Sequence, residues 1–126
     1  ALLRGAQGRI VTALSGSGPA YVFLIIEALL DAGKQMGLSP QVARRLAEQT
    51  LAGSAALAAA APDSPSELRR HVTSPGGTTE AAIAVLETRA VREAFVAAVL
   101  AARAKSEALG KPAGPAPRST LLPPTP

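Results

Sequence analysis

The chain has 126 residues, a formal net charge of +4 and no cysteine, and 48% of its residues are hydrophobic while only 2% are aromatic. This length predicts one domain at most, with a tail. The lack of cysteine excludes disulfides, thiolate catalysis and zinc–thiolate sites, and a single histidine also argues against a transition-metal site. Because the basic residues are spread along the chain and few aromatic rings could stack on bases, the charge favours solubility over nucleic-acid binding.

The hydrophobic residues do not form an obvious membrane segment. The uninterrupted apolar run Ala20 to Ile26 is far shorter than the ~20 residues that a membrane span needs. No signal peptide is visible at the start, and the lack of cysteine allows a reducing compartment. We therefore expect a cytoplasmic protein with no membrane partner. The first residue is Ala1 rather than Met, which suggests a fragment or a processed start.

An all-α fold is predicted, because alanine is abundant and β-branched runs with a period of two are absent. Glycines break up residues 1–10, which are interpreted as a linker or a frayed helix end. Residues 111–126 are rich in Pro and Gly and are expected to form a disordered tail. Pro, Ser and Gly signals between these ends predict a bundle of about five helices: Pro19 to Met36, Pro40 to Ala61, Pro65 to Val72, Thr78 to Thr88 and Ala90 to Leu109.

The short third helix has clear signals at both ends. Ser64 and Glu67 have the spacing of a capping box, with Pro65 at the first helical position. The single histidine, His71, falls in the last turn, where positive charge suits the helix dipole. Because no Asp or Ser is placed near His71 in the sequence to complete a triad, we expect an exposed residue at a helix end.

The first long helix is apolar on nearly all of its faces, which requires burial on all sides. Its polar strip, Glu27, Asp31 and Lys34, is interpreted as a solvated or paired face, since no second carboxylate cluster accompanies it. In the next helix the small residues of Leu51 to Ala58 favour a close helix–helix crossing. Five helices of this size cannot easily cover such a surface, so we predict an obligate homodimer with an apolar interface above roughly 2,000 Å².

The stretch from Val72 to Glu80 is the strongest candidate for a binding site. Pro75 ends the element before it, and the two glycines that follow allow unusual backbone conformations and close approach of a ligand. Thr78 and Thr79 are natural N-cap residues for the apolar run behind them. Such a turn directs backbone N–H groups and the positive end of a helix dipole at one point, which favours a carboxylate or a phosphate.

Five groups of residues match one known family in the same order. They are Thr12-Ala13-Leu14-Ser15-Gly16-Ser17-Gly18-Pro19-Ala20-Tyr21, Gly37-Leu38 with Ala43, Leu68-Arg69, Val72-Thr73-Ser74-Pro75-Gly76-Gly77-Thr78-Thr79, and Ala82 with Val85-Leu86-Glu87. Together they resemble the C-terminal dimerisation domain of pyrroline-5-carboxylate reductase. The resemblance covers a helical domain over residues 11–110, and its Ser-Pro-Gly-Gly-Thr-Thr block is the most specific part.

The resemblance implies an activity and an architecture. The family reduces 1-pyrroline-5-carboxylate to L-proline with NAD(P)H, the last step of proline biosynthesis. Its members join an N-terminal Rossmann domain to an all-α domain that interleaves with a second copy, and some dimers assemble into decamers. No strand–glycine turn–helix unit is present here, since Gly16-x-Gly18 lacks a preceding strand and a third glycine. The cofactor would therefore be bound by an absent domain, and this chain alone is expected to be inactive.

The resemblance also assigns roles to residues of the candidate site. The loop from Ser74 to Thr79 would hold the substrate carboxylate through main-chain N–H groups, and Thr79 would lie beside the imine nitrogen. A threonine hydroxyl does not ionise near neutral pH, so this residue would position the ring or relay a proton rather than act as a general acid. Thr79 is the expected catalytic residue, and the expected substrate-binding residues are Val72, Ser74, Pro75, Gly76, Gly77, Thr78 and Thr79.

Two alternatives to a reductase remain open. The chain could be a stand-alone helical dimerisation module with no activity. It could also be the helical domain of another NAD(P)-dependent two-domain dehydrogenase that acts on a different small acid. Residues upstream of Ala1 would separate an enzyme from an inactive module, because a Gly-x-Gly-x-x-Gly/Ala turn in a βαβ unit indicates dinucleotide binding.

Overall fold

The computed structural model describes residues 5–110, and nearly all of them are helical. The elements are α1 (Gly5–Val11), a π-helix η1 (Thr12–Gly16), α2 (Gly18–Gln35), α3 (Pro40–Ala60), α4 (Pro65–His71), α5 (Thr78–Thr88) and α6 (Val91–Gly110). The all-α prediction is confirmed, and each of the five expected helices begins and ends within one residue of its expected bounds. The expected tail, 111–126, lies outside the described residues.

The chain opens with three consecutive helical elements, α1, η1 and α2. Residues 5–10, for which the sequence left a linker or a frayed helix end open, are part of this stretch. The wide turn of η1 is closed by the Ser17 N–H, which donates to the Thr12 carbonyl oxygen at 2.9 Å. The Tyr21 hydroxyl donates to the carbonyl oxygen of buried Ala13 at 2.8 Å. A side chain of α2 thus satisfies a backbone acceptor at the junction between the two helices.

Helices α2 and α3 form an antiparallel hairpin. Gly37 ends α2 with a φ of +96°, and the Leu38 N–H then reaches back to the Gly33 carbonyl oxygen at 3.0 Å. This is the Schellman arrangement that terminates many helices. Ser39 begins α3, because its hydroxyl oxygen accepts from the Val42 N–H at 3.3 Å.

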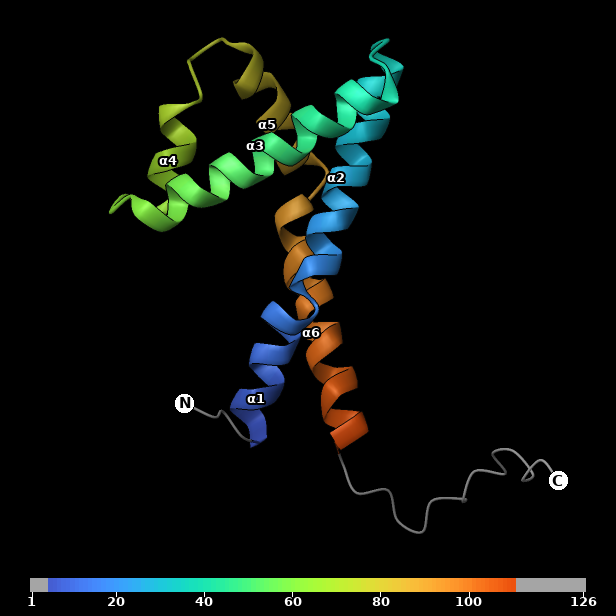
Figure 1. Ribbon diagram of the computed structural model, residues 1–126. Coiled ribbons are helices and arrows are strands. Elements are labelled where there is room, and N and C mark those ends of the chain that lie inside the picture. Colours follow the sequence, from blue (N-terminus) through green and yellow to red (C-terminus); the bar gives the residue numbers. More distant parts are fainter. Residues whose placement is uncertain (1–4, 111–126) are drawn as a thin grey trace, which may run out of the picture.

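The tightest packing in the hairpin lies beside the connecting turn. Gly33, Ala43 and Ala47 are buried there, and a Cβ added to Gly33 would lie 2.9 Å from the Ala43 Cβ. The sequence predicted a close helix–helix crossing at Leu51 to Ala58. In the single chain that half of α3 is largely exposed, so this crossing stays a prediction. The short turn holds α2 and α3 together near Gly33, and the two helices diverge beyond it (Figure 1).

The later helices return to the start of the chain. α6 runs beside α1 and contacts η1, while α5 packs against the beginning of α6 (Figure 1). α5 and α6 are joined through Ala90, which has a positive φ of +57° and follows the last turn of α5. α4 lies near the far end of α3, so the segment between α4 and α5 forms an outer corner of the molecule.

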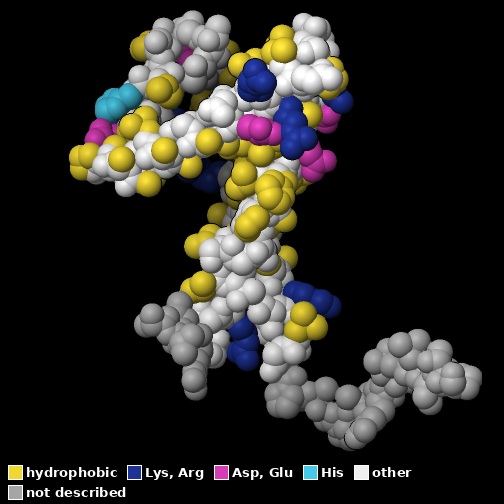
Figure 2. Space-filling view, in the orientation of Figure 1, with side chains coloured by type: hydrophobic (Ala, Val, Ile, Leu, Met, Phe, Trp, Pro, Cys, Tyr) yellow, Lys and Arg dark blue, Asp and Glu magenta, His cyan; other side chains and the backbone are white. Residues whose placement is uncertain are grey.

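The single chain has almost no hydrophobic core. Within residues 5–110 the buried hydrophobic residues are Ala13, Ala43 and Ala47. Large side chains of α2 remain in solvent, with Phe23 61% exposed and Leu24 65% exposed. Figure 2 shows hydrophobic side chains distributed along the outside of α2 and α3. Because burial of apolar area is the main favourable term in folding, this surface requires a cover.

The helical stretch Gly5–Gln35 would also be long and apolar enough to cross a membrane, judged by length and composition alone. An 18-residue window in it has a mean hydropathy of 1.5, and 6% of that window is buried in the single chain. The stretch is much longer than the apolar run at Ala20 to Ile26, because polar and small residues continue the helix on both sides. Its apolar surface must meet either protein or lipid.

Candidate functional site

The segment between α4 and α5 is a tight turn. Pro75 and Gly76 are its central residues, and the Gly77 N–H donates to the Ser74 carbonyl oxygen at 3.0 Å. Gly76 has a φ of +73°. Proline followed by a residue with positive φ is the pattern of a type II β-turn, in which glycine is strongly favoured at the third position. The order Ser-Pro-Gly-Gly therefore specifies this turn locally.

Helix α5 begins with a residue that has no side chain. Gly77 is the N-cap, in an extended conformation, while Thr78 and Thr79 lie in the first turn of the helix. The expectation that a threonine would cap α5 is wrong, because the turn ends in extended backbone at Gly77 and the helix starts at the next residue. No acceptor for the N–H groups of Thr78, Thr79 and Glu80 is present among residues 5–110. These donors lie at the positive end of the α5 dipole.

The N–H groups of both glycines in the turn already have acceptors within the chain. The Gly76 N–H donates to Glu80 Oε1 at 3.0 Å, and the Gly77 N–H closes the turn onto Ser74. The donors left open are therefore those of Thr78, Thr79 and Glu80, farther along the chain than the glycines. The sequence analysis assigned no role to Glu80. An acidic residue three positions after a helix cap usually signals a contact with the cap N–H, and here the carboxylate accepts the N–H of the preceding residue.

The other expected site residues lie on the approach to the turn. Val72 is exposed and lines a hollow of about 270 Å³ between α3 and α4. The Thr73 hydroxyl donates to the Arg69 carbonyl oxygen, which ties the segment to the end of α4. Thr78 is exposed and Thr79 is half-buried. The structure thus brings the expected residues into one turn and one helix start, and their ligand remains a prediction.

His71 does not belong to this arrangement. It is exposed at the end of α4, as the sequence predicted, and its Nδ1 lies 3.8 Å from Asp63 Oδ2. The sequence did not anticipate that contact, since Asp63 precedes the helix and only the fold of α4 brings the two side chains together. Among residues 5–110 neither side chain of the pair is hydrogen-bonded to a hydroxyl, so the pair does not form a catalytic triad.

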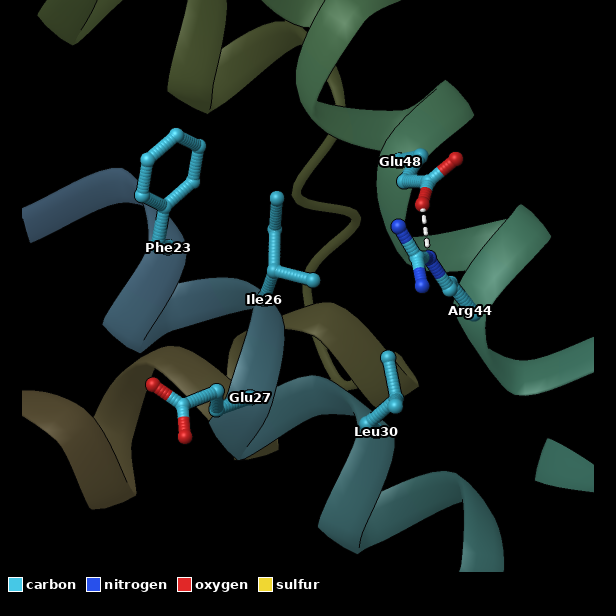
Figure 3. A pocket seen from close by; sticks show the side chains of 6 residues that line it. All are labelled: Phe23, Ile26, Glu27, Leu30, Arg44 and Glu48. Atoms are coloured by element: carbon cyan, nitrogen blue, oxygen red, sulfur yellow. Dashed lines mark hydrogen bonds and ion pairs between the residues drawn. The ribbon is translucent and has the colours of Figure 1, made fainter. Parts of the chain in front are cut away.

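A crevice of about 480 Å³ between α2 and α3 is a second candidate (Figure 3). Its walls are formed by Phe23, Ile26, Glu27, Leu30, Arg44 and Glu48. Arg44 and Glu48 pair with each other on α3, and the opposite wall presents mainly apolar side chains of α2. The crevice offers no hydroxyl, imidazole or free backbone donor to a small substrate. It suits apolar side chains of another helix better.

The described residues do not supply a cofactor site. Within residues 5–110 no three His, Asp or Glu side chains are grouped so as to hold a metal ion. That part of the chain also has no strand, and Gly16 and Gly18 lie at the junction of η1 and α2 rather than after a strand. A dinucleotide fold needs the strand, the glycine turn and the helix together, so these residues do not fit NAD(P)H.

A family model described as pyrroline-5-carboxylate reductase dimerisation matches residues 6–109. The chain belongs to this family. The resemblance found in the motifs is thereby confirmed, and the match extends over all the helices described above.

Individual relatives of this dimerisation family agree with the assignment. Pyrroline-5-carboxylate reductase from Synechocystis is 50% identical over 101 residues, which cover 80% of this chain and 38% of the relative. The Mycobacterium leprae enzyme is 51% identical over an alignment of 121 positions, which includes 82% of this chain and 41% of the relative. The chain therefore spans about two fifths of the length of these relatives.

Solved structures of pyrroline-5-carboxylate reductases have the same fold over this region. The Coxiella burnetii structure gives a TM-score of 0.83 at 48% identity, over 87% of this chain and 41% of that chain. The Plasmodium falciparum structure, solved with NADP bound, also gives 0.83, at 38% identity, over 86% of this chain and 42% of that chain.

Proposed function

We propose that this chain is the dimer-forming and substrate-binding part of a pyrroline-5-carboxylate reductase, which reduces 1-pyrroline-5-carboxylate to L-proline in proline biosynthesis. Its family and the names of its relatives support this function. One structural observation carries the proposal: three N–H groups at the start of α5 have no acceptor among residues 5–110, and the cap residue before them has no side chain. The substrate has one carboxylate, which such a helix start can bind.

In the proposed site the carboxylate lies against the N–H groups of Thr78, Thr79 and Glu80. The turn from Ser74 to Gly77 lets it approach the main chain closely, because no side chain stands at the cap. The Thr79 hydroxyl hydrogen-bonds the imine nitrogen and thus orients the C=N bond for reduction. Val72 and Pro75 form the apolar edge of the site.

The electrons come from NAD(P)H, which supplies a hydride when it is bound. Since residues 5–110 do not form a dinucleotide site, the nucleotide is held by residues outside that range. The role of this chain is to bind the substrate and to orient it toward the incoming hydride.

A second copy of the chain covers the apolar faces of α2 and α3 in this proposal. The family's dimerisation role supports a protein cover over a lipid one for Gly5–Gln35. The dimer is interleaved, with higher assembly available to it, and is located in the cytoplasm. Size-exclusion chromatography with light scattering in detergent-free buffer should give twice the chain mass. A stable monomer at micromolar concentration would contradict the dimer.

The activity is tested on the purified protein encoded by the complete reading frame that includes this chain. The purified protein should oxidise NADPH or NADH when 1-pyrroline-5-carboxylate is added and should form L-proline. Turnover of another small imino or keto acid in preference would favour a different dehydrogenase. A folded dimer without turnover of any such substrate would favour the inactive module.

A further inference from the structure

The feature that the proposed mechanism leaves unused is the side chain of Glu80. It is the third residue of α5, and its Oε1 accepts the Gly76 N–H at 3.0 Å. If the N-cap residue had a hydroxyl, its oxygen could accept the N–H of the third helical residue, as in a capping box. Here the cap is Gly77, which has no hydroxyl, and Glu80 accepts the N–H of the residue before the cap instead of the cap N–H.

This contact determines which backbone donors are free. Gly76 has a positive φ and lies in an exposed turn, where an unpaired N–H would compete for any anion that approaches. The Glu80 carboxylate removes that competitor and ties the turn to the first turn of α5.

We infer that Glu80 is a positioning residue for substrate: it fixes the Ser74–Gly77 turn and thereby directs the carboxylate to the open N–H groups of the helix. The inference rests on the proposed function, because it concerns the same substrate. The Glu80 side chain acts through Gly76 and does not touch the reacting atoms.

Two substitutions in the complete enzyme separate this role from a general loss of structure. Glu80→Ala removes the acceptor, while Glu80→Gln keeps an acceptor oxygen and removes the charge. We expect Glu80→Ala to raise KM for 1-pyrroline-5-carboxylate about tenfold with little change in kcat, and Glu80→Gln to restore most of the affinity. Glu93→Ala is the matched control, since Glu93 is exposed and is likewise the third residue of its helix.

A second readout measures the contact itself. In this chain, hydrogen exchange of the Gly76 amide should accelerate in Glu80→Ala and stay near the unmodified rate in Glu80→Gln. An unchanged KM in Glu80→Ala, or an equal loss in Glu80→Gln, would overturn the inference. The proposed function fails separately: in that case Gly76 exchange would still respond to Glu80→Ala, but the unsubstituted complete enzyme would not turn over 1-pyrroline-5-carboxylate at all.

Discussion

Helices α4 and α5 follow one another closely in the chain, yet they begin in opposite ways. At the start of α4, the Ser64 hydroxyl oxygen accepts the Glu67 N–H at 3.2 Å, and Glu67 Oε1 accepts the Ser64 N–H at 3.3 Å. At the start of α5, the cap Gly77 has no side-chain oxygen, and Glu80 Oε1 accepts the N–H of Gly76, the residue before the cap. Both helices have a glutamate at the third position, so the difference lies in the cap residue.

The comparison shows that the N–H groups at a helix start can either be hydrogen-bonded by the chain's own cap residue or remain available to a ligand. The Ser64 hydroxyl and then the Ser64 N–H lower the pKa of the Glu67 carboxyl, because both donate to it at the start of α4. At Gly77 an added Cβ would lie 3.1 Å from the Ser74 carbonyl oxygen. The turn therefore keeps a capping side chain out of α5, and the helix donors stay open.

The largest expected effect concerns the threonine at the open start. Thr79→Ala in the complete enzyme should lower kcat/KM for 1-pyrroline-5-carboxylate about 100-fold, because the imine loses the hydroxyl that orients it. Steady-state kinetics measure the effect, and light scattering should show an unchanged dimer. Wild-type kinetics in the variant would remove Thr79 from the mechanism.

Blocking the open N–H groups at the start of α5 should have the next largest effect. Gly77→Val places a Cβ 3.1 Å from the Ser74 carbonyl oxygen and puts a side chain in the way of the α5 donors, so KM should rise at least about tenfold. Gly53→Val is the control, since nothing lies within 4 Å of a Cβ added at Gly53 in α3. An unaltered substrate KM in Gly77→Val would count against the carboxylate site.

Removing the side-chain cap of α4 should lower the stability of the fold and leave substrate binding unchanged. Ser64→Ala removes the cap of α4 and should destabilise the folded chain by about 1 kcal/mol. Thermal unfolding at a fixed chain concentration measures this change. The substrate KM of the complete enzyme should not respond, and a KM increase similar to that of Gly77→Val would show that the two helix starts are not distinct.

The smallest expected effect is a pH dependence confined to α4. Because folding lowers the pKa of Glu67, its contribution is present above the ordinary glutamate pKa and is lost as the pH falls through the lowered value. In Ser64→Ala the Glu67 pKa should move back up toward the ordinary value. An NMR titration of the Glu67 carboxyl carbon follows both forms, and identical titration curves would contradict the capping account.

Local signals made most of the fold predictable. Ser39 with Pro40, and Ser64 with Pro65 and Glu67, mark helix starts by hydrogen bonds that span only a few residues. The turn at Pro75 was equally readable, since proline and a glycine with positive φ specify it.

The parts that the sequence did not reveal depend on contacts across the chain. The crossing at Gly33 and Ala43 lies where the hairpin turn holds the helices together, whereas small residues occur along all of α3. Which N–H groups of the site remain open could be decided only once the partners of Gly76 and Gly77 were known.

The near absence of buried side chains ties the folded state to the amount of protein. One chain buries only three alanines as hydrophobic core within residues 5–110, so in the proposed dimer folding and association are a single equilibrium. Each tenfold dilution then lowers the free energy of unfolding of the dimer by about 1.4 kcal/mol. Chains at low abundance would remain unpaired and open to proteases, and the quantity of folded protein would rise more steeply than its synthesis.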